Sequence, residues 1–171
     1  MNKKRFTTAV LLSWLIFLMI DFILHASLLA KLWQSGYPAL KSLKELALLI
    51  PTGYLSFLIL TILVCWIYLT FYREDPGLKQ TIKFGVVFGG LFSAANMLGL
   101  YSYIELPVIF ILLINIGYFI EFLILIIVIR YIFFAENLKM RAVRIVFLFF
   151  TGLIIGVVLQ NISNVYQSNA F

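Results

Sequence analysis

The chain alternates between long apolar runs and short polar links, and the apolar runs have the length of membrane-spanning helices. A spanning helix needs about 20 predominantly apolar residues. Five runs meet this requirement, at residues 6–32, 46–72, 82–103, 107–134 and 143–162. The pattern therefore predicts an all-α integral membrane protein, a compact bundle of five transmembrane helices that forms one domain over residues 1–171.

The links carry the turn-forming residues. Arg73-Glu-Asp-Pro-Gly77 separates the second run from the third, and Pro107 suits the first turn of the fourth. Pro51 lies near the start of the second run, where it is expected to kink or fray the first turn. Gln160-Asn161 enters the final turn of the last run. Four spans with a peripheral C-terminal helix are therefore the alternative.

The composition indicates that lipid is the solvent. Of the 171 residues, 64% are hydrophobic and 12% are charged, which is more apolar side chain than a water-soluble core of this size can bury. The net charge is +6, but the basic residues are scattered between apolar runs and form no patch with interleaved aromatics. The expected partner is thus the lipid bilayer, with no nucleic acid. Cys65 is the only cysteine, which excludes a disulfide framework.

The basic residues also predict an orientation. Ten of the 13 lysines and arginines fall on the side of the N-terminus in the five-span topology. By the positive-inside rule the N-terminus is then cytoplasmic and the C-terminus lies outside. The ten are Lys3, Lys4, Arg5, Arg73, Lys79, Lys83, Arg130, Lys139, Arg141 and Arg144, and the other three are Lys31, Lys41 and Lys44.

Two ionisable residues interrupt the first apolar run. Asp21 and His25, the only histidine, are four residues apart, so a helix places them on one face. An ionisable group in the hydrocarbon region costs at least a few kcal/mol unless it is neutralised or partnered. The sequence therefore predicts an intramembrane polar site that begins with this pair.

Other runs carry polar residues at comparable depth. With a rise of about 1.5 Å per residue, Glu121 falls near the level of Asp21, whereas Asn96 and Asn115 fall further toward the outside, as His25 does. Tyr54 and Gln160 lie near the outer ends of their runs. The residues predicted to bind a ligand or protons are Asp21, His25, Asn96, Asn115, Tyr118 and Glu121.

Two structural explanations of these residues remain open. The polar side chains can face unrelated neighbours without forming a pocket. Alternatively, Asp21 and His25 can form a closed hydrogen-bonded pair that pins the first helix to the fourth, because buried polar groups usually find partners.

Two strips of small residues predict close helix packing. The third run contains Gly85, Gly89 and Ser93 at four-residue spacing, and the last run contains Gly152 and Gly156. Such strips let helix backbones approach closely where lipid supplies no hydrophobic drive for association.

Two blocks resemble a group of small bacterial membrane proteins of unknown function. Asp21-Phe-Ile-Leu-His25-Ala-Ser-Leu-Leu is similar to the pattern of histidine, small residue and two leucines in that group's first helix. Lys83-Phe-Gly-Val-Val-Phe-Gly89, continuing through Tyr101, Leu106-Pro107, Gly117 and Glu121, resembles its third and fourth helices. The resemblance covers about half the chain and implies a small helical bundle of the bacterial inner membrane. This chain departs from the group by its fifth apolar run, after Phe134.

Two classes of function fit these features. The first is a membrane protein whose polar pocket binds or translocates a small ligand or protons. No internal repeat is visible, so alternating access within one copy would be unusual, and a homodimer would relieve that difficulty. The second is a non-catalytic accessory or assembly subunit, docked in a larger membrane complex through aromatic, lipid-facing helices.

An enzyme is not expected, and the pattern names neither a cofactor nor a metal site. The links are too short for a separate catalytic domain. Asp21, His25 and Glu121 could in principle hold one divalent ion together with water, but metal catalysis normally requires more ligands than these three.

The topology is tested by reporter fusions placed after Asn137 and after Phe171. Five spans place these two positions on opposite sides of the membrane, so one fusion should report the cytoplasm and the other the outside. If both report the cytoplasm, the last apolar run does not span.

Overall fold

The computed structural model describes residues 2–34 and 37–168, with only the backbone described at Leu43 and at 163–168. All elements of this part of the chain are helical. They are α1 (Lys3–Asp21), the π-helix η1 (Phe22–Leu28), α2 (Ala30–Trp33), α3 (Leu43–Phe71), α4 (Gly77–Tyr103), α5 (Val108–Phe133) and α6 (Leu138–Ser168).

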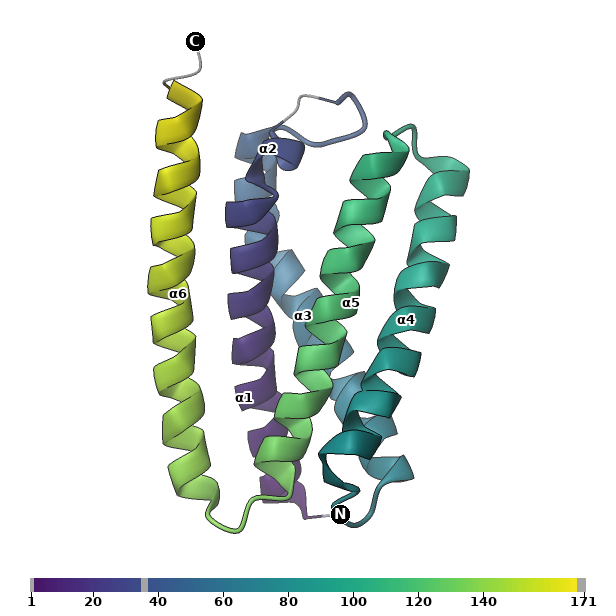
Figure 1. Cartoon of the computed structure of the whole chain (residues 1–171), viewed down its shortest axis with the longest axis vertical. Coiled ribbons are helices and arrows are strands. Elements are labelled where there is room, and N and C mark those ends of the chain that lie inside the picture. The colour runs from purple at the N-terminus through teal and green to yellow at the C-terminus, as the bar shows by residue number, and fades with distance from the viewer. Residues whose placement is uncertain (1, 35–36, 169–171) are drawn as a thin grey trace.

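The long helices run up and down along one axis (Figure 1). One end of the bundle holds the N-terminus, the α3–α4 link and the α5–α6 link, and we call it the N-terminal end. The opposite end holds α2, the α4–α5 link and the last turns of α6.

Among the described residues, five helical segments are long and apolar enough to cross a membrane. The last of them, Leu138–Ile162, matches the others in length and apolar character, in agreement with five spans rather than four. The predicted all-α bundle is confirmed. The segments are Lys3–Leu28, Lys44–Phe71, Gly77–Tyr103, Val108–Phe133 and Leu138–Ile162.

The first span differs from the prediction, because it is not one uniform helix over residues 6–32. Its α-helical part ends at Asp21, and a π-helix follows over Phe22–Leu28. The backbone N–H of Leu29 donates to the carbonyl of Leu24, five residues earlier, at 2.8 Å. π-Helical segments are rare and occur frequently at functional sites. Here the segment contains His25.

The second span begins earlier than predicted. Ser42 caps α3: its hydroxyl accepts from the backbone N–H of Glu45, and the Glu45 carboxylate accepts from the backbone N–H of Ser42. This capping box satisfies donors that a helix start leaves unpaired. Pro51 consequently lies inside α3 and not in its first turn, so the predicted fraying of the first turn there is wrong.

The third span also begins earlier, at the predicted turn itself. Gly77 has φ +77°, a conformation that glycine adopts readily, and its N–H donates to the Asp75 carboxylate at 2.9 Å. The same carboxylate receives two hydrogen bonds from Arg130 of α5, at 2.7 and 2.9 Å. Arg130 thereby holds the pKa of Asp75 below its usual value and ties the α3–α4 link to α5.

α5 is the central helix, and the apolar core forms around it. It packs against both α4 and α1, and half of its most apolar stretch is buried. The rings of Phe17 and Phe122 lie 5.7 Å apart, and Phe92 of α4 approaches Phe122 at 4.4 Å. This core holds α1 and α5 side by side. It lies between the N-terminal end of the bundle and the level of Asp21 and Glu121.

The glycine strips are at close helix contacts, as predicted. A Cβ atom at Gly85 would lie 2.8 Å from Leu123 of α5. On α6, a Cβ atom at Gly156 would lie 2.6 Å from the Phe22 ring, and one at Gly152 would overlap Met19. The two strips therefore serve different neighbours: α4 packs against α5, whereas α6 packs against α1 and η1.

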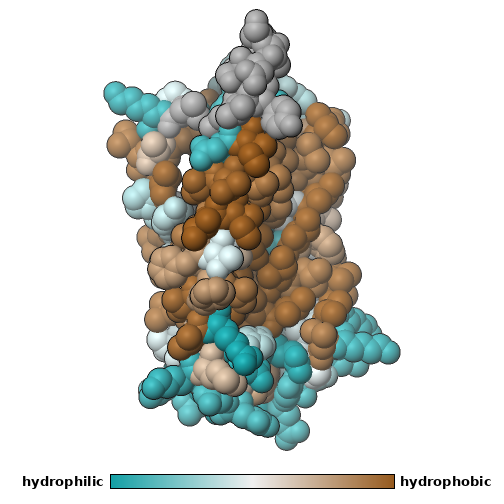
Figure 2. All heavy atoms as spheres, turned by 60° about the vertical axis from the view of Figure 1, so that its left-hand side comes forward, coloured by the Kyte–Doolittle hydropathy of each residue, from teal (hydrophilic) through white to brown (hydrophobic). Residues whose placement is uncertain are grey.

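The outer surface has the distribution expected of a protein in lipid. Figure 2 shows the face of the molecule that carries α6, where apolar atoms cover most of the middle and hydrophilic atoms gather at the lower end and at the upper left. Exposed leucine, isoleucine, valine and phenylalanine side chains occur along α3, α4 and α6. Such surface is stable against hydrocarbon and unfavourable in water.

Replacement of Gly89 by leucine is expected to lower the free energy of unfolding by about 1–3 kcal/mol, because side chains forced into a packed contact displace their neighbours. A Cβ atom there would lie 3.2 Å from Cβ of Phe122 and 3.4 Å from the Phe119 carbonyl oxygen. The measurement is thermal unfolding in detergent.

Gly90→Leu is the matched control, because the nearest atom to a Cβ at that position is Cε2 of Phe119 at 4.0 Å. It should unfold at or above the wild-type temperature. Equal melting temperatures for the two variants would show that α4 does not pack on α5 through Gly89.

Candidate functional site

Three ionisable side chains from the first and fourth spans meet inside the bundle. One donor atom each from Asp21, His25 and Glu121 lies within 4.8 Å of the other two. The closest approach is 3.3 Å, between Nε2 of His25 and Oε1 of Glu121. The first and fourth spans, which run in opposite directions, thus bring together three of the residues predicted to bind a ligand or protons.

Two features position the His25 side chain: the π-helix in which it lies and a glycine on the facing helix α5. His25 lies in the middle of η1, one turn beyond Asp21. A Cβ atom at Gly117 of α5 would lie 3.1 Å from Nε2 of His25, so any larger residue there would press on the imidazole. Gly117 and Glu121 are one helical turn apart and both face His25.

Aromatic rings surround the rest of the imidazole. The Trp33 ring of α2 meets it edge-on at a centroid distance of 5.8 Å, and the Tyr118 ring lies 5.6 Å away on the α5 side. Trp33 in turn packs edge-on against Phe110 at 5.4 Å. These contacts leave the imidazole little freedom to turn away from Glu121.

The pair is deeply buried and poorly hydrogen-bonded. Glu121 is 0% exposed and His25 is 8% exposed. Within the described part of the chain, neither oxygen of Glu121 and neither ring nitrogen of His25 has a partner in hydrogen-bond geometry. Their 3.3 Å approach is therefore an ion-pair distance without an aligned hydrogen bond. A buried polar group without a hydrogen bond lowers the free energy of unfolding by about 1–3 kcal/mol, and a charged one lowers it by more.

Asp21 and His25 also form part of the wall of a cavity of about 460 Å³. α3 supplies the facing wall, and Tyr118 of α5 and Gln160 of α6 contribute at the sides. Ile50, Gly53 and Tyr54 are exposed as well as lining the space, so the cavity opens to the surface on the α3 side. The lining residues are Asp21, His25, Ala26, Ala30, Trp33, Gln34, Leu46, Ile50, Gly53, Tyr54, Phe57, Tyr118 and Gln160.

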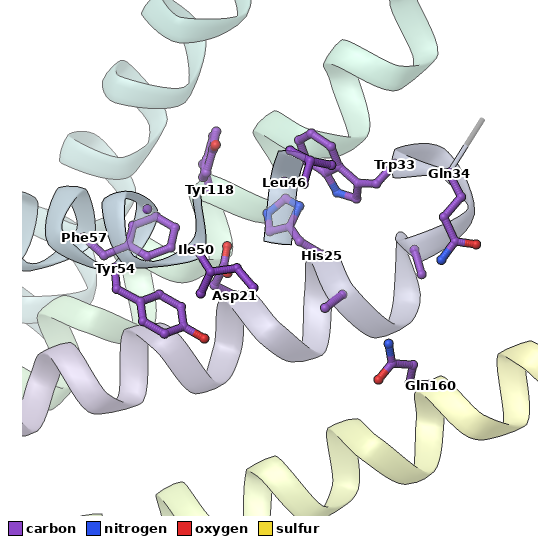
Figure 3. Close-up of a pocket in the computed structure, with 13 residues that line it drawn as sticks. Asp21, His25, Trp33, Gln34, Leu46, Ile50, Tyr54, Phe57, Tyr118 and Gln160 are labelled. Carbon is purple, nitrogen blue, oxygen red and sulfur yellow. The ribbon is translucent and has the colours of Figure 1, made fainter. Parts of the chain in front are cut away.

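Side chains of separate helices converge around this space (Figure 3). Asp21 and His25 project from the first span, Tyr54 and Phe57 from α3, and Gln160 reaches from α6. Glu121 is not among the lining residues: it is fully buried and meets His25 at 3.3 Å. Any group that enters the cavity therefore meets Asp21 and His25 first and reaches Glu121 through them.

Two predicted site residues lie elsewhere. Asn96 of α4 donates to the side-chain oxygen of Asn115 of α5 at 2.9 Å, and Asn115 donates to the carbonyl of Ile111 at 2.7 Å. Neither asparagine lines the cavity. Their similar predicted depth did not indicate the cavity, because the Asn115 side chain accepts the hydrogen bond from Asn96 and donates its own within α5.

The sequence reasoning missed the aromatic wall. Trp33 and Phe57 line the cavity, but an aromatic residue in an apolar run is indistinguishable from one that faces lipid. Trp33 also follows the predicted end of the first span. The short helix α2 brings its ring to the His25 ring, and no signal in the sequence indicated this contact.

Comparison of the chain with protein-family models, curated proteins and solved structures finds no match. The resemblance to a group of small bacterial membrane proteins stays a prediction.

A double-mutant cycle tests whether His25 and Glu121 interact. Glu121→Leu removes a buried carboxyl that has no hydrogen bond, but it also takes away the polar group 3.3 Å from Nε2 of His25, so its effect on the free energy of unfolding depends on whether His25 is present. In His25→Leu/Glu121→Leu both polar groups are gone, so the double variant should be more stable than the sum of the two single effects predicts, by about 0.5–3 kcal/mol. Chemical unfolding in detergent measures all four proteins.

Strict additivity of the two substitutions would contradict direct contact. Asn115→Leu combined with His25→Leu is the control pair and should be additive, because Asn115 bonds to Asn96 and not to the cluster.

Proposed function

We propose that this protein binds a small ligand inside the membrane, in the cavity between the first span and α3, with Asp21 and His25 as the groups that recognise it. The observation that carries the proposal is the fully buried Glu121 without a hydrogen-bond partner, 3.3 Å from His25 at the cavity wall. A structural role would be served better by a satisfied pair or by apolar residues of similar volume.

The side chains of the cavity wall indicate what kind of ligand the cavity binds. Asp21 and His25 are the ionisable groups of the wall, Gln34, Gln160 and two tyrosines add polar atoms, and the other lining side chains, among them Trp33, Leu46 and Phe57, are apolar. Pockets of about 300–1,000 Å³ with a few placed polar groups are typical of small-molecule sites. The ligand is therefore a small molecule or ion with a polar or positively charged part against Asp21 and His25.

The same groups are suited to holding protons. Asp21, His25 and Glu121 form a chain of titratable side chains that leads from the cavity wall to the centre of the bundle. Ionisable chains of this kind inside membranes mark proton and substrate pathways. Proton transfer through the cluster can accompany ligand binding.

We place the protein in the bacterial inner membrane with its N-terminus in the cytoplasm and its C-terminus outside. Ten of the 13 basic residues belong to the N-terminal end of the bundle, where the positive-inside rule expects them. The cavity lies toward the opposite end, so in this orientation the ligand approaches from the outer half of the bilayer.

The proposal is tested by filling the cavity. Gly53 lines it, and a Cβ atom at this position meets nothing within 4 Å. Gly53→Trp should therefore fold normally and occupy the binding space. The measurement is native mass spectrometry of the protein extracted in mild detergent, with identification of the small molecules it retains.

Wild type should retain a species that Gly53→Trp and Asp21→Asn have lost. Thr52→Trp is the matched control, since it adds the same side chain at an exposed neighbouring position that does not line the cavity. The same retained molecules in all four proteins would contradict a binding pocket. Retention of a partner protein by all four, without a cavity-dependent molecule, would favour an accessory subunit.

A further inference from the structure

We infer that Asp21, His25 and Glu121 form a binding site for one divalent transition-metal ion, with a free coordination position that faces the cavity. This inference rests on the proposed function, because it places a metal ion at the polar wall of that cavity, beside the molecule that the cavity binds. Three kinds of observation carry it: the distances between the donor atoms, their unsatisfied burial and the charge of the set.

The distances match the coordination sphere of a small ion. Zinc binds histidine nitrogen and carboxylate oxygen at about 2.0–2.2 Å, which in a tetrahedral site separates neighbouring ligand atoms by about 3.3 Å. Nε2 of His25 and Oε1 of Glu121 are 3.3 Å apart. The third donor, from Asp21, is within 4.8 Å of both. Asp21 is only half-buried, so its carboxylate can rotate from the cavity wall to complete the set.

The burial of Glu121 calls for a positive charge beside it, and a metal ion held together with His25 supplies one. The side chain is 0% exposed and neither oxygen has a hydrogen-bond partner in the described part of the chain. Buried charges are normally paired or coordinate metals. The His25 nitrogens are equally without hydrogen bonds, and neutral imidazole is the form that ligates a metal.

The charge of the set fits a divalent ion. Two carboxylates and a neutral imidazole carry a charge of −2, which one divalent cation neutralises. A neutral assembly removes most of the penalty that isolated charges meet in hydrocarbon. The imidazole favours zinc, copper, iron or nickel over magnesium and calcium, which prefer oxygen ligands.

Three protein ligands leave one position for water or for a ligand in the cavity. Asp21 and His25 line the cavity, so this open position faces it. Sites that act on or exchange a ligand keep such a position, whereas closed structural zinc sites fill all four. The sequence named these three residues as candidate ligands of one divalent ion, but it did not give the distances between their donor atoms.

The test is a zinc titration of the purified, metal-free protein in detergent with the affinity tag removed. Wild type should bind about one Zn²⁺ per chain, measured by elemental analysis after gel filtration, and Co²⁺ should give a visible absorption spectrum of a nitrogen and oxygen site. Glu121→Gln and His25→Gln should each weaken zinc binding at least about tenfold. Glu105→Gln, an exposed carboxyl in the α4–α5 link, is the control and should bind like wild type.

Thermal unfolding of every variant shows whether it is folded. If Glu121→Gln and His25→Gln do not fold, Asp21→Asn is used instead, because Asp21 is only half-buried. Absence of bound zinc in wild type, or equal binding in wild type and all ligand variants, would overturn the metal site. Gly53→Trp separates the two proposals. This variant should still bind zinc but should no longer retain the molecule in the cavity. If wild type binds no zinc but retains a molecule that Gly53→Trp loses, the metal site is contradicted and the binding pocket is supported.

Discussion

A carboxyl group with no exposed surface, held inside an apolar helical bundle, is the constraint on which the rest of this structure depends. Glu121 lies on the central helix α5, and the nearest polar atom of the cluster is Nε2 of His25 at 3.3 Å. The free energy of leaving such a group in hydrocarbon is large enough to decide how the neighbouring helices pack. The first span carries both side chains that can compensate it, and this span is the one whose helix is irregular.

The irregular segment and the glycine contacts act together to bring His25 to Glu121. The π-helix over Phe22–Leu28 changes the direction of the side chains that follow Asp21, and Gly117 leaves room for the imidazole. On the other side, Gly156 lets α6 pack directly on η1, and the Ser27 hydroxyl donates to the Gly156 carbonyl at 2.8 Å. The last helix therefore supports the irregular segment from behind.

The opening beside the cluster follows from the path of α3. The Trp14 indole donates to the Tyr54 carbonyl at 3.0 Å and joins α1 to α3 below the site. Toward the opposite end, Leu46, Ile50 and Gly53 of α3 line the cavity that separates α3 from the first span. Apolar helices normally close such space against each other. Its presence next to three ionisable groups is why we interpret the region as a binding site and not as a structural pair.

The sequence predicted the large features because their physical signals are local. Apolar run length determined the five helices, and the small-residue strips identified the contacts at Gly85, Gly89, Gly152 and Gly156. The four-residue spacing of Asp21 and His25, with the depth of Glu121, was enough to predict their cluster. The cost of each group in lipid made contact favourable.

The remaining features depend on long-range packing. Nothing in Phe22–Leu28 distinguishes a π-helix from an α-helix, and the capping box at Ser42 was hidden in a link that was assigned as loop. Asn96 and Asn115 have the same chemistry as site residues, but their partners are each other. Depth along the bundle was predictable, whereas the side of each helix on which a polar residue finds its partner was not.

The central claim, that His25 is held against Glu121, is tested most directly by the nitrogen NMR spectrum of the single histidine in ¹⁵N-histidine-labelled protein, since the chain contains one histidine and the spectrum reports it alone. The account predicts that Glu121→Gln shifts the Nε2 resonance, whereas Asn96→Gln leaves it unchanged, because the Asn96 side chain bonds to Asn115. Identical Nε2 resonances in wild type and Glu121→Gln would contradict it.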